Sequence, residues 1–461
     1  MLKNIKSKKQ AKFETFEFKN DNIILYDGVN HKNYNIEEFI KYIINKNDYF
    51  FYSNDDILEL IPEIKKLNLN DYEINSNNES FITCRKISDK NSKITISDSK
   101  FLIRPSIYET KSCKDLYEKI DKIYKDYAPN VGCKVTIANL AMANFRSNFM
   151  NEDIIINGLP KYIEDFIRKS SIRGRREIFK MKSEPNKIVY HYDFNSMYPS
   201  VMLEDMPNGK IIHTKTIKED KIGFYRCLVD VPIDTKIPLL YKKNTKLTFP
   251  TGKFIGVYDS SEIIEAIKNG TKVKVLYGYY FEDKINLFKE YVNYYYEKKN
   301  EFASEIKLNK NILDKSLRDT ANIESKFGYE ISKLMLICLY GKFIQSRKDN
   351  DTTHNKNSNP NYIIPSISMH IASLARIKLY RLMLEHENDI LYVNGDSIKT
   401  YKKINNNVGN KLGELKLSYC CKNIVYHEPN YYEYDLCDEK GNIIGDRIIK
   451  DKRNNNKYLM K

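Results

Sequence analysis

The sequence contains no Cys-x-x-Cys pair and no apolar run long enough to cross a membrane. Its eight cysteines have no histidines nearby at zinc-site spacing, which excludes the common zinc modules and favours reduced thiols. A membrane helix needs roughly 18 apolar residues in a row, and the basic start MLKNIKSKKQAKF lacks the apolar stretch of a secretory signal. We therefore expect a soluble, cytoplasmic protein without a membrane partner.

Basic residues outnumber acidic ones along the chain. Its 461 residues include 76 Lys and Arg against 61 Asp and Glu, a formal net charge of +15. At about 150 residues per domain, this length accommodates two to four domains. A basic surface attracts polyanions, so nucleic acid is the leading class of partner. AT-rich coding sequences also over-produce Lys, Asn, Ile and Tyr, so charge by itself does not decide the function.

The first third of the chain has the pattern of an α/β domain. Short β-rich runs mix with amphipathic helical stretches over residues 1–168. The basic segment 168–182, RKSSIRGRREIFKMK, has no sustained apolar period and is interpreted as a polar connection. Two successive helices are predicted further on, over 283–313 and 323–340, which indicates a helical hairpin set into a sheet domain.

Beyond these helices the composition becomes strongly polar over residues 345–360, which predicts a loop. Apolar residues then recur every three or four positions over 367–384, which predicts an amphipathic helix that leads into DILYVNGDSIKT. The last 50 or so residues are rich in Tyr and Lys and show no clear periodicity.

The segment IVYHYDFNSMYPSVM carries the first candidate catalytic carboxylate. An apolar strand ends at Asp193, Asn195 and Ser196 follow as helix-cap residues, and Pro199 lies early in a helix. A carboxylate beside a helix N-terminus suits a metal ion and a phosphate. Alternatively, Asp193 only caps the helix, which is the commoner role for such a motif in isolation.

A second candidate carboxylate is Asp396 in ILYVNGDSIKT. Asn394-Gly395 between two β-capable runs is a strong hairpin signal, because both residues tolerate positive φ. Asp396 is then expected at the tip of the hairpin. The alternative is an ordinary surface hairpin with a polar tip.

The third element is the segment KLMLICLYGKF. Lys333 and Tyr340 are seven residues apart, so they share one face of a helix predicted to end at Gly341. Alternatively, this is a buried apolar helix whose lysine reaches the surface. Two carboxylates brought together from distant positions can hold two divalent ions, and a helix-borne lysine can neutralise the triphosphate that such ions bind. The three elements together therefore favour a nucleotidyl-transfer site.

These segments resemble the motifs of family B DNA polymerases. DFNSMYPS resembles motif A (D-x-x-S-L-Y-P), KLMLICLYGKF resembles motif B (K-x-x-x-N-S-x-Y-G), and YVNGDS resembles motif C (Y-x-D-T-D-S). The resemblance is greatest to the protein-primed branch of phages and linear plasmids. It implies an α+β multidomain fold, in which a degenerate RNase H-like exonuclease domain precedes the palm, helical fingers and small thumb of a right-hand polymerase. The expected bounds are 1–168 for the exonuclease-like domain, 169–282 for the first part of the palm, 283–344 for the fingers, 345–410 for the second part of the palm and 411–461 for the thumb.

Carried over residue by residue, the resemblance implies roles for the motif residues. Asp193 and Asp396 ligate two magnesium ions, for which manganese can substitute, with help from the Phe194 carbonyl. Ser196 and Tyr198 belong to the nucleotide site, where Tyr198 packs against the incoming sugar and excludes a 2′-hydroxyl.

The resemblance also implies contacts to the triphosphate and to DNA. Lys333 contacts the triphosphate, and Tyr340 lies beneath the nascent base pair. IRGRRE resembles a worn Y-x-G-G element, which links exonuclease to palm and contacts the template. The DNA-binding residues implied in this way are Arg173, Gly174, Arg175, Gly341, Tyr431 and Tyr432.

The sequence departs from the family pattern at several positions. Asn394 stands where motif C has its first Asp, so we expect weaker magnesium binding without automatic loss of activity. Ile337 and Cys338 replace the Asn-Ser of motif B, which removes polar contacts near the nucleotide. The K-x-Y element after motif C has no lysine in EPNYYEY, and the polar 345–360 segment is short for the family's second insertion, which leaves processivity and strand displacement open.

The exonuclease motifs are less well preserved. KFET resembles D-F-E-T with Lys12 in the aspartate position, while Asn54-Asp55 and Tyr117-x-x-x-Asp121 resemble the second and third motifs. A lysine in place of a metal-ligand carboxylate introduces a cation where a divalent ion binds. We therefore expect proofreading to be weak or absent.

The sequence as a whole favours a template-directed DNA polymerase that extends a 3′ or protein-linked hydroxyl, with replication of a viral or plasmid genome as its setting. Its expected partners are a DNA primer-template, deoxynucleoside triphosphates and a terminal protein supplied in trans. The alternative is a catalytically impaired relative that binds nucleic acid or a partner protein. An RNA-templated polymerase is disfavoured because S-M-Y-P, rather than a second acidic residue, follows motif A.

Overall fold

The computed structural model describes most of the chain, namely residues 1–5, 10–20, 22–47, 49–55, 57, 60–66, 71–77, 81–89, 92–103, 110–172, 174–245, 247–345, 362–451 and 459–460. The chain forms two compact units. The first unit comprises Met1–Ile155 and Glu290–Ile363, and the second comprises Ile156–Lys289 and Ile364–Lys461. Within the described residues, every helix is too short or too polar to span a bilayer.

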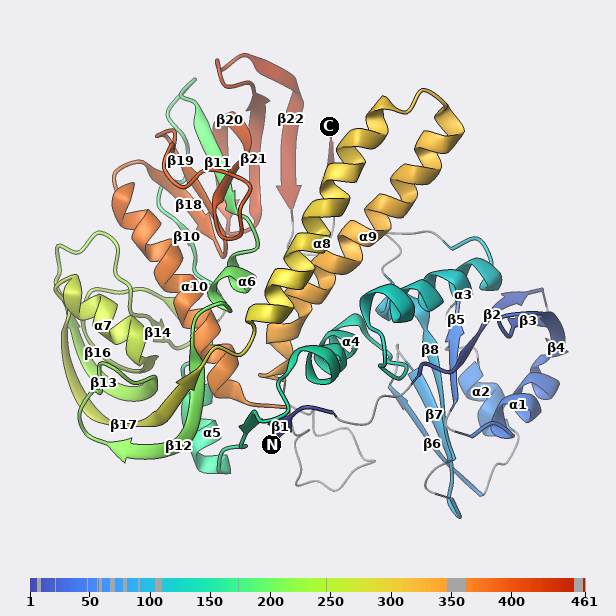
Figure 1. The fold of residues 1–461 in the computed structure, drawn as a ribbon. Helices are drawn as coiled ribbons and strands as arrows, with labels where there is room; N and C mark the ends of the chain where they lie inside the picture. Colours follow the sequence, from blue (N-terminus) through green and yellow to red (C-terminus); the bar gives the residue numbers. More distant parts are fainter. Residues whose placement is uncertain are drawn as a thin grey trace. The chain divides into compact units, whose positions relative to one another are not determined.

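A seven-stranded mixed sheet forms the core of the first unit (Figure 1). Strand β2 lies parallel to β5, and β5 lies parallel to β8, whereas the other neighbours are antiparallel. In spatial order the strands are β4 (His31–Asn35), β3 (Asn22–Tyr26), β2 (Phe13–Lys19), β5 (Tyr49–Ser53), β8 (Lys93–Asp98), β7 (Phe81–Lys86) and β6 (Tyr72–Asn77). The short strands β1 (Leu2–Lys3) and β9 (Ile155–Ile156) lie outside this sheet.

Helices cover both faces of the seven-stranded sheet. Helices α1 (Ile36–Ile44) and α2 (Leu60–Lys66) pack their apolar residues on one face, and α3 (Cys113–Lys122) lies on the other. Asn35 caps α1 in a reciprocal capping box with Glu38, which fixes where the helix begins. Successive residues of β2 therefore alternate between the α1 side and the α3 side.

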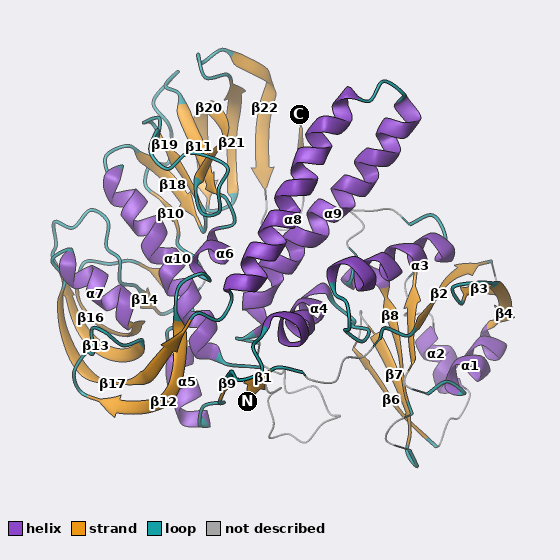
Figure 2. Ribbon diagram, in the orientation of Figure 1, coloured by secondary structure: helices purple, strands orange, loops and turns teal. Residues whose placement is uncertain are grey.

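Two long helices complete the first unit, and Figure 2 shows them as an antiparallel pair. They are α8 (Lys289–Leu308) and α9 (Lys315–Lys342), and α9 packs against α4 (Ile137–Asn144). The buried rings of Tyr291 and Tyr295 meet Phe149 at centroid distances of 5.2 and 5.9 Å. The Tyr291 hydroxyl also donates to the Met335 carbonyl at 2.7 Å. Aromatic packing thus anchors the helical hairpin.

The predicted hairpin is confirmed, but its boundaries differ from those that periodicity indicates. Residues 283–285 end the long strand β17 (Lys272–Ile285), so α8 begins later than expected. Helix α9 begins earlier, because the Asp314 side chain accepts from the Leu317 amide at 2.9 Å and caps it. The helix also runs through Gly341 to Lys342, so Gly341 does not end it.

An eight-stranded antiparallel sheet carries both candidate carboxylates in the second unit. In spatial order its strands are β10 (Arg176–Ile178), β18 (Ile390–Asn394), β19 (Ser397–Thr400), β11 (Val189–Phe194), β20 (Leu415–Glu428), β21 (Tyr431–Cys437), β22 (Ile443–Asp451) and β23 (Leu459–Met460). Strands from residues 176 to 460 thus meet in one sheet.

A second, four-stranded antiparallel sheet has the order β12 (Met206–Thr214), β17, β13 (Gly223–Val231) and β16 (Gly252–Asp259). A small pair, β14 (Lys242–Lys243) and β15 (Leu247–Thr248), forms a separate two-stranded sheet next to β16. The helices of this unit are α5 (Lys161–Arg168), α6 (Met197–Val201), α7 (Ser260–Lys268) and α10 (Pro365–Glu385).

Helix α10 confirms the helix expected over 367–384, but it is buried on nearly every side rather than along one apolar face. Two of its buried polar residues, Arg376 and His370, pair with acidic residues at the start of α7, whereas the Ser366 hydroxyl and Arg376 Nη1 are buried without a hydrogen-bond partner among the described residues. Arg376 pairs with Glu262 at 2.7 Å, and His370 Nδ1 lies 2.8 Å from the Asp259 carboxylate. These pairs join α10 to the start of α7 and satisfy charges that water cannot reach.

Other expectations change where strands form. The segment interpreted as a polar connection contains β10, and the last 50 or so residues, which show no clear periodicity, contain the long strands β20 to β22. The polar loop expected over 345–360 lies outside the described residues beyond Gln345. The finer division into palm, fingers and thumb stays a prediction.

Candidate functional site

The backbones that carry Asp193 and Asp396 lie side by side. Asp193 on β11 is opposite Ser397 on β19, and the Phe194 amide donates to the Asp396 carbonyl at 2.9 Å. These residues are some 200 positions apart in the sequence. The antiparallel register of β11 and β19 therefore brings the two candidate carboxylates to one end of the eight-stranded sheet.

The predicted hairpin between β18 and β19 is confirmed, with its turn displaced by one residue. Asn394 is paired with Ser397, so the two loop residues are Gly395 and Asp396 rather than Asn394 and Gly395. Gly395 has φ +68°, which a glycine at the first loop position adopts without steric cost. Asp396 is exposed at the tip, as expected.

The Asp193 side chain is held on one oxygen. Its Oδ2 accepts a 2.6 Å hydrogen bond from the Ser418 hydroxyl on β20 and lies 3.3 Å from His191 Nε2. Burial alone would raise the pKa of this carboxyl, but its contacts with His191 and Ser418 outweigh burial and hold the pKa below its usual value. Asp193 is thus ionised near neutral pH. The sequence offered no signal for Ser418.

His191 supports Asp193 as a neutral ring. The imidazole is buried against Tyr419, and burial lowers its pKa to about 4. Because an ionised Asp193 can only accept hydrogen bonds, the proton of the neutral ring belongs on Nε2. A neutral donor orients the carboxylate without cancelling its charge.

A tight turn follows β11. Its first residue, Asn195, donates from its amide to the Glu414 carbonyl at 2.8 Å and from its side chain to the Gly409 carbonyl at 2.8 Å. Ser196 has φ +52°, an unfavourable conformation for a residue other than glycine. Its side chain makes no capping bond to α6, which differs from its expected role as a cap. The turn is held by contacts with the 407–414 loop.

The segment expected to contact template approaches the tip of the hairpin. A Cβ on Gly174 would lie 2.9 Å from the Gly395 Cα and 3.2 Å from the Tyr198 hydroxyl, so only glycine fits there. The Gly395 amide also donates to the Arg175 carbonyl at 2.8 Å. Gly174, Tyr198 and Gly395 therefore meet beside Asp396. Arg173 lies outside the described residues.

The Arg175 side chain points inward. Its guanidinium is 3% exposed, pairs with Glu177 at 2.6 Å, donates to the Pro238 carbonyl at 2.6 Å, and lies 4.1 Å from the centre of the Phe249 ring. A buried, fully engaged guanidinium is placed to hold its loop rather than to reach a phosphate. This geometry does not support the expected DNA contact of Arg175.

Asn394, which stands where the family has its first motif C aspartate, takes part in a polar chain. Arg176 Nε donates to its Oδ1 at 2.8 Å, and its amide nitrogen lies 3.3 Å from Asn430 Oδ1. An amide oxygen is a weaker ligand for a hard cation than a carboxylate, and the adjacent guanidinium disfavours a cation further.

The two tyrosines expected to contact DNA differ in exposure. Tyr431 is half-buried beside His427, whereas Tyr432 is 3% exposed. The ring centre of Tyr432 lies 3.9 Å from the ammonium of Lys399, which is itself fully buried. Tyr432 therefore belongs to a cation–π contact inside the sheet domain, which sequence reasoning missed.

Lys333, Tyr340 and Gly341 belong to the first unit, on α9. All three are half-buried rather than fully buried, whereas Leu334, Met335, Leu336 and Leu339 of the same helix are buried. The Lys333 ammonium lies 3.4 Å from Glu330, and a Cβ on Gly341 would meet nothing within 4 Å. Lys333 and Tyr340 thus both lie on an accessible side of α9, in agreement with their seven-residue spacing.

Glu14 and Asp121, which belong to the first and third exonuclease-like motifs, lie on opposite sides of their sheet. Glu14 faces α1, where it accepts from the Tyr42 hydroxyl and pairs with Lys46 at 3.1 Å. Asp121 lies on α3, across the sheet, and pairs with Lys125 at 2.6 Å. The acidic residue of β2 that faces α3 is Glu17, whose carboxylate accepts from the Cys113 amide at 2.8 Å.

The donor set at the end of β11 suits magnesium. Asp193 and Asp396 offer carboxylate oxygens and Phe194 a carbonyl, and magnesium is commonly bound by one or two carboxylates together with water and substrate phosphates. Among the described residues, three or more His, Cys, Asp or Glu side chains nowhere gather as a metal cluster. The fit therefore rests on two carboxylates.

Comparison with known proteins places the chain in a family. The model of the family "DNA polymerase type B, organellar and viral" matches residues 110–362, which is more than half of the chain. The chain belongs to the organellar and viral type B DNA polymerases. The matched region includes Asp193, Lys333 and Tyr340 and ends before Asp396.

Several relatives of this type B polymerase chain are known by sequence. A probable DNA polymerase of Neurospora intermedia is 27% identical over 375 residues, which cover 70% of this chain and 36% of the relative. The DNA polymerase of Streptococcus phage Cp-1 is 26% identical over 306 residues, 58% of this chain and 50% of the relative. The chain thus spans about a third to a half of these relatives.

Solved structures confirm the fold. Phi29 DNA polymerase, complexed with primer-template DNA and incoming nucleotide substrates, matches with a TM-score of 0.73 at 15% identity over 97% of this chain and 92% of that chain. Phi29 polymerase with primer-template DNA alone matches with a TM-score of 0.67. The expected right-hand polymerase fold is therefore correct.

Proposed function

We propose that this chain is a template-directed DNA polymerase, which adds deoxynucleotides to a 3′ or protein-linked hydroxyl during replication of a viral or plasmid genome. The observation that carries this proposal is the register of β11 and β19, which sets Asp193 opposite Ser397 and bonds the Phe194 amide to the Asp396 carbonyl. Family membership and the fold of phi29 polymerase support the same conclusion.

In this proposal Asp193 and Asp396, with the Phe194 carbonyl, hold two magnesium ions, for which manganese can substitute. When bound, such ions lower the pKa of the attacking hydroxyl and stabilise the departing pyrophosphate. Ser418 and His191 keep Oδ2 of Asp193 in place, which leaves Oδ1 of this ionised carboxylate to face a cation. The chain itself thus supplies orientation and negative charge.

We assign the nucleotide contacts to Ser196, Tyr198, Lys333 and Tyr340. Tyr198 follows the turn after β11, next to Gly174, where an aromatic ring can pack on the sugar and exclude a 2′-hydroxyl. Lys333 supplies the cation for the triphosphate, and Tyr340 the aromatic surface beneath the new base pair. These roles rest on the match to motifs A and B.

For DNA, we propose contacts through Arg173, Gly174, Gly341 and Tyr431, and a supporting role for Arg175 and Tyr432, which are buried. A terminal protein in trans is the proposed primer source in the protein-primed mode. Proofreading is proposed to be weak or absent, since Glu14 and Asp121 lie on opposite sides of their sheet and each is ion-paired with a lysine.

Primer extension tests the polymerase proposal. Wild type, Asp396→Ala and the control Asp230→Ala are compared with magnesium and with manganese on DNA and RNA templates. Asp230 lies in the same unit, on β13, and its carboxylate lies 3.9 Å from the Lys253 ammonium in an exposed ion pair. We expect Asp396→Ala to lose at least about 1000-fold in incorporation, as each ten-fold is about 1.4 kcal/mol of lost stabilisation. Equal incorporation by Asp396→Ala and wild type would contradict the assignment of Asp396 to the catalytic site.

The second candidate function is a catalytically impaired relative that binds nucleic acid or a partner protein. The Arg176–Asn394 hydrogen bond favours it, because a guanidinium and an amide occupy the place of a metal-ligand carboxylate. A protein that binds primer-template with wild-type affinity but incorporates no nucleotide with either metal supports this alternative.

A further inference from the structure

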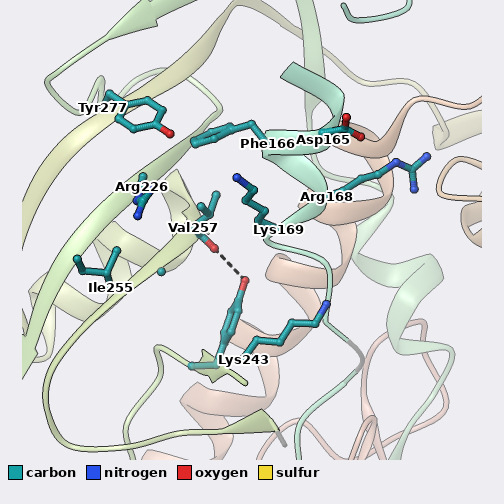
Figure 3. Close-up of a pocket in the computed structure, with 11 residues that line it drawn as sticks. Asp165, Phe166, Arg168, Lys169, Arg226, Lys243, Ile255, Val257 and Tyr277 are labelled. Carbon is teal, nitrogen blue, oxygen red and sulfur yellow. Dashed lines mark hydrogen bonds between the residues drawn. The ribbon is translucent and has the colours of Figure 1, made fainter. Parts of the chain in front are cut away.

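A basic hollow of about 520 Å³ lies in the second unit, between the C-terminal end of α5 and the outer face of the four-stranded sheet. Ligand sites commonly have volumes of about 300–1,000 Å³. The polymerase proposal assigns none of the residues that line this hollow. Figure 3 shows its lining side chains, which come from α5, β13, β16 and β17 and from the segment around Lys243.

The charge of the hollow is positive and largely uncompensated. Four cations line it, and its single carboxylate, Asp165, is paired outside with Lys161 at 2.9 Å. Arg168 pairs with Glu164 at 2.8 Å. Among the described residues, no carboxylate lies within ion-pair distance of Lys169 or of Arg226, and both side chains are exposed. The hollow therefore attracts an anion at these two positions.

An apolar wall lies next to these cations. Arg226 is paired across the sheet with Val257 on one side and Tyr277 on the other, so all three share one sheet face. The Tyr277 ring lies 5.3 Å from the buried Phe166 ring. Ile255, on β16 across the intervening strand β13, is 49% exposed. In Figure 3 Lys169 extends toward the two rings, whereas Arg168 points away. A planar apolar group can lie on Tyr277 while a phosphate meets Lys169 and Arg226.

Alternating anions and planar rings are the chemistry of a nucleic acid strand. Single-stranded nucleic acid is bound by basic grooves with aromatic platforms, which stack bases of any sequence. Lys169, Arg226 and Ile255 are exposed, so the hollow is open to a strand that enters and leaves. An acidic peptide would satisfy the cations but not the half-buried Tyr277 ring or the exposed Ile255 side chain.

We propose that this hollow is a second, non-catalytic site for single-stranded nucleic acid, with phosphates on Lys169 and Arg226 and a base against Tyr277. The proposal goes beyond the polymerase activity and does not depend on it. DNA and RNA share the chemistry involved.

Binding is tested with the full chain in EDTA, where metal-dependent transfer cannot run, so the result is independent of the polymerase proposal. A fluorescent 12-nucleotide strand, as DNA and as RNA, is titrated by anisotropy at several salt concentrations. The test variant is Lys169→Glu/Arg226→Glu, and the charge-matched control is Lys210→Glu/Lys215→Glu, two exposed lysines of the same unit that do not line the hollow.

We expect the test variant to bind at least about ten-fold more weakly, with a salt slope reduced by roughly 1.4 for two lost phosphate contacts. The control variant keeps the wild-type slope. Tyr277→Ala is expected to weaken binding about ten-fold without changing the slope, because it removes stacking only. The neutral variant Lys169→Gln/Arg226→Gln replaces the charge reversal if thermal unfolding shows that the latter does not fold.

A second measurement locates the strand. An oligonucleotide with 5-iodouracil is photocrosslinked and the modified residue is mapped by mass spectrometry, with Tyr277 as the expected position. Binding of either strand in this way supports the site, and the ratio of affinities tells DNA from RNA. Equal losses in test and control variants, crosslinks confined to other residues, or displacement by polyglutamate as effective as by oligonucleotide would each overturn the proposal.

Discussion

In the seven-stranded sheet, Glu14 turns toward α1 and ends buried between Tyr42 and Lys46, whereas in the eight-stranded sheet Asp193 lies at the end of β11 beside the hairpin of Asp396. Both strands carry a recognisable acidic motif. In the first unit, side-chain alternation along β2 turns Glu14 toward α1, whereas Asp121 lies on α3, which covers the opposite face of the sheet. A motif thus keeps its chemistry only where strand register brings its carboxylates together.

The two settings also differ in what neutralises the charge. Glu14 is 2% exposed and forms an ion pair with Lys46, so its charge stabilises the fold. Asp193 is held by a serine hydroxyl and a neutral imidazole, which orient the carboxylate and leave its charge for a cation. Ion pairing indicates a structural carboxylate, and neutral donors indicate one available to a ligand.

The strongest test of this comparison is to remove one carboxylate from each sheet. We expect Asp193→Ala to reduce nucleotide incorporation at least about 1000-fold, because a lost metal ligand removes several kcal/mol of transition-state stabilisation. Glu14→Ala is expected to stay within about two-fold of wild type. Steady-state incorporation on a primed DNA template measures both, and a comparable loss in Glu14→Ala would contradict the comparison.

The same pair of variants should show the opposite order in stability. Glu14→Ala leaves Lys46 without its partner beside the sheet, and we expect a loss of about 2 kcal/mol, below the 3–5 kcal/mol of fully buried pairs because Lys46 is partly exposed. Asp193→Ala, at a half-exposed position, is expected to cost less than about 1 kcal/mol. Urea-induced unfolding measures both values, and equal losses would argue against the contrast.

Asn394→Asp tests the same comparison with a variant that is expected to increase nucleotide incorporation. A carboxylate at this position adds negative charge beside Asp396, and Arg176 already lies within hydrogen-bond distance to orient it. We expect about five-fold higher incorporation at limiting magnesium and little change at saturation. Asn430→Asp, one hydrogen bond further away, is the matched control. A gain in the control, or none in Asn394→Asp, is the contradicting result.

The smallest expected effect concerns Ser418. Its hydroxyl donates a single hydrogen bond to Asp193, worth about 0.7 kcal/mol, so Ser418→Ala is expected to raise the half-saturating magnesium concentration about three-fold while kcat at saturation changes little. Ser418→Thr keeps the hydroxyl and should restore the wild-type magnesium dependence. A drop in kcat that magnesium does not rescue would assign Ser418 a structural role instead.

Several parts of the fold follow from sequence patterns. The 367–384 period marks α10, and the Asn-Gly signal marks the β18–β19 hairpin, because both depend on contacts between near neighbours. The boundaries were less accurate. The Asp314 cap starts α9 early, and continuous β17 delays α8, since capping and strand pairing override helix periodicity.

The sequence could not reveal the long strands of the C-terminal region or the direction of Arg175. Strand β20 lacks a regular alternation of apolar and polar residues, because bulges at residues 422–428 interrupt the two-residue period that predicts a strand. Arg175 and Arg176 are adjacent residues of the same type. Nevertheless, Arg175 is buried against Glu177 and Phe249, whereas Arg176 donates a hydrogen bond to Asn394.

The family motifs, the net positive charge and the candidate carboxylates Asp193 and Asp396 can be read directly from the amino-acid sequence, because residue identity and local spacing are enough to specify them. The three-dimensional structure is needed to show which acidic residues are neighbours. It shows that Ser418 and His191 contact Asp193, and that Glu14 forms an ion pair with Lys46. Those outcomes depend on which strands pair and in which register, and pairing between distant segments is fixed by the packing of the whole sheet.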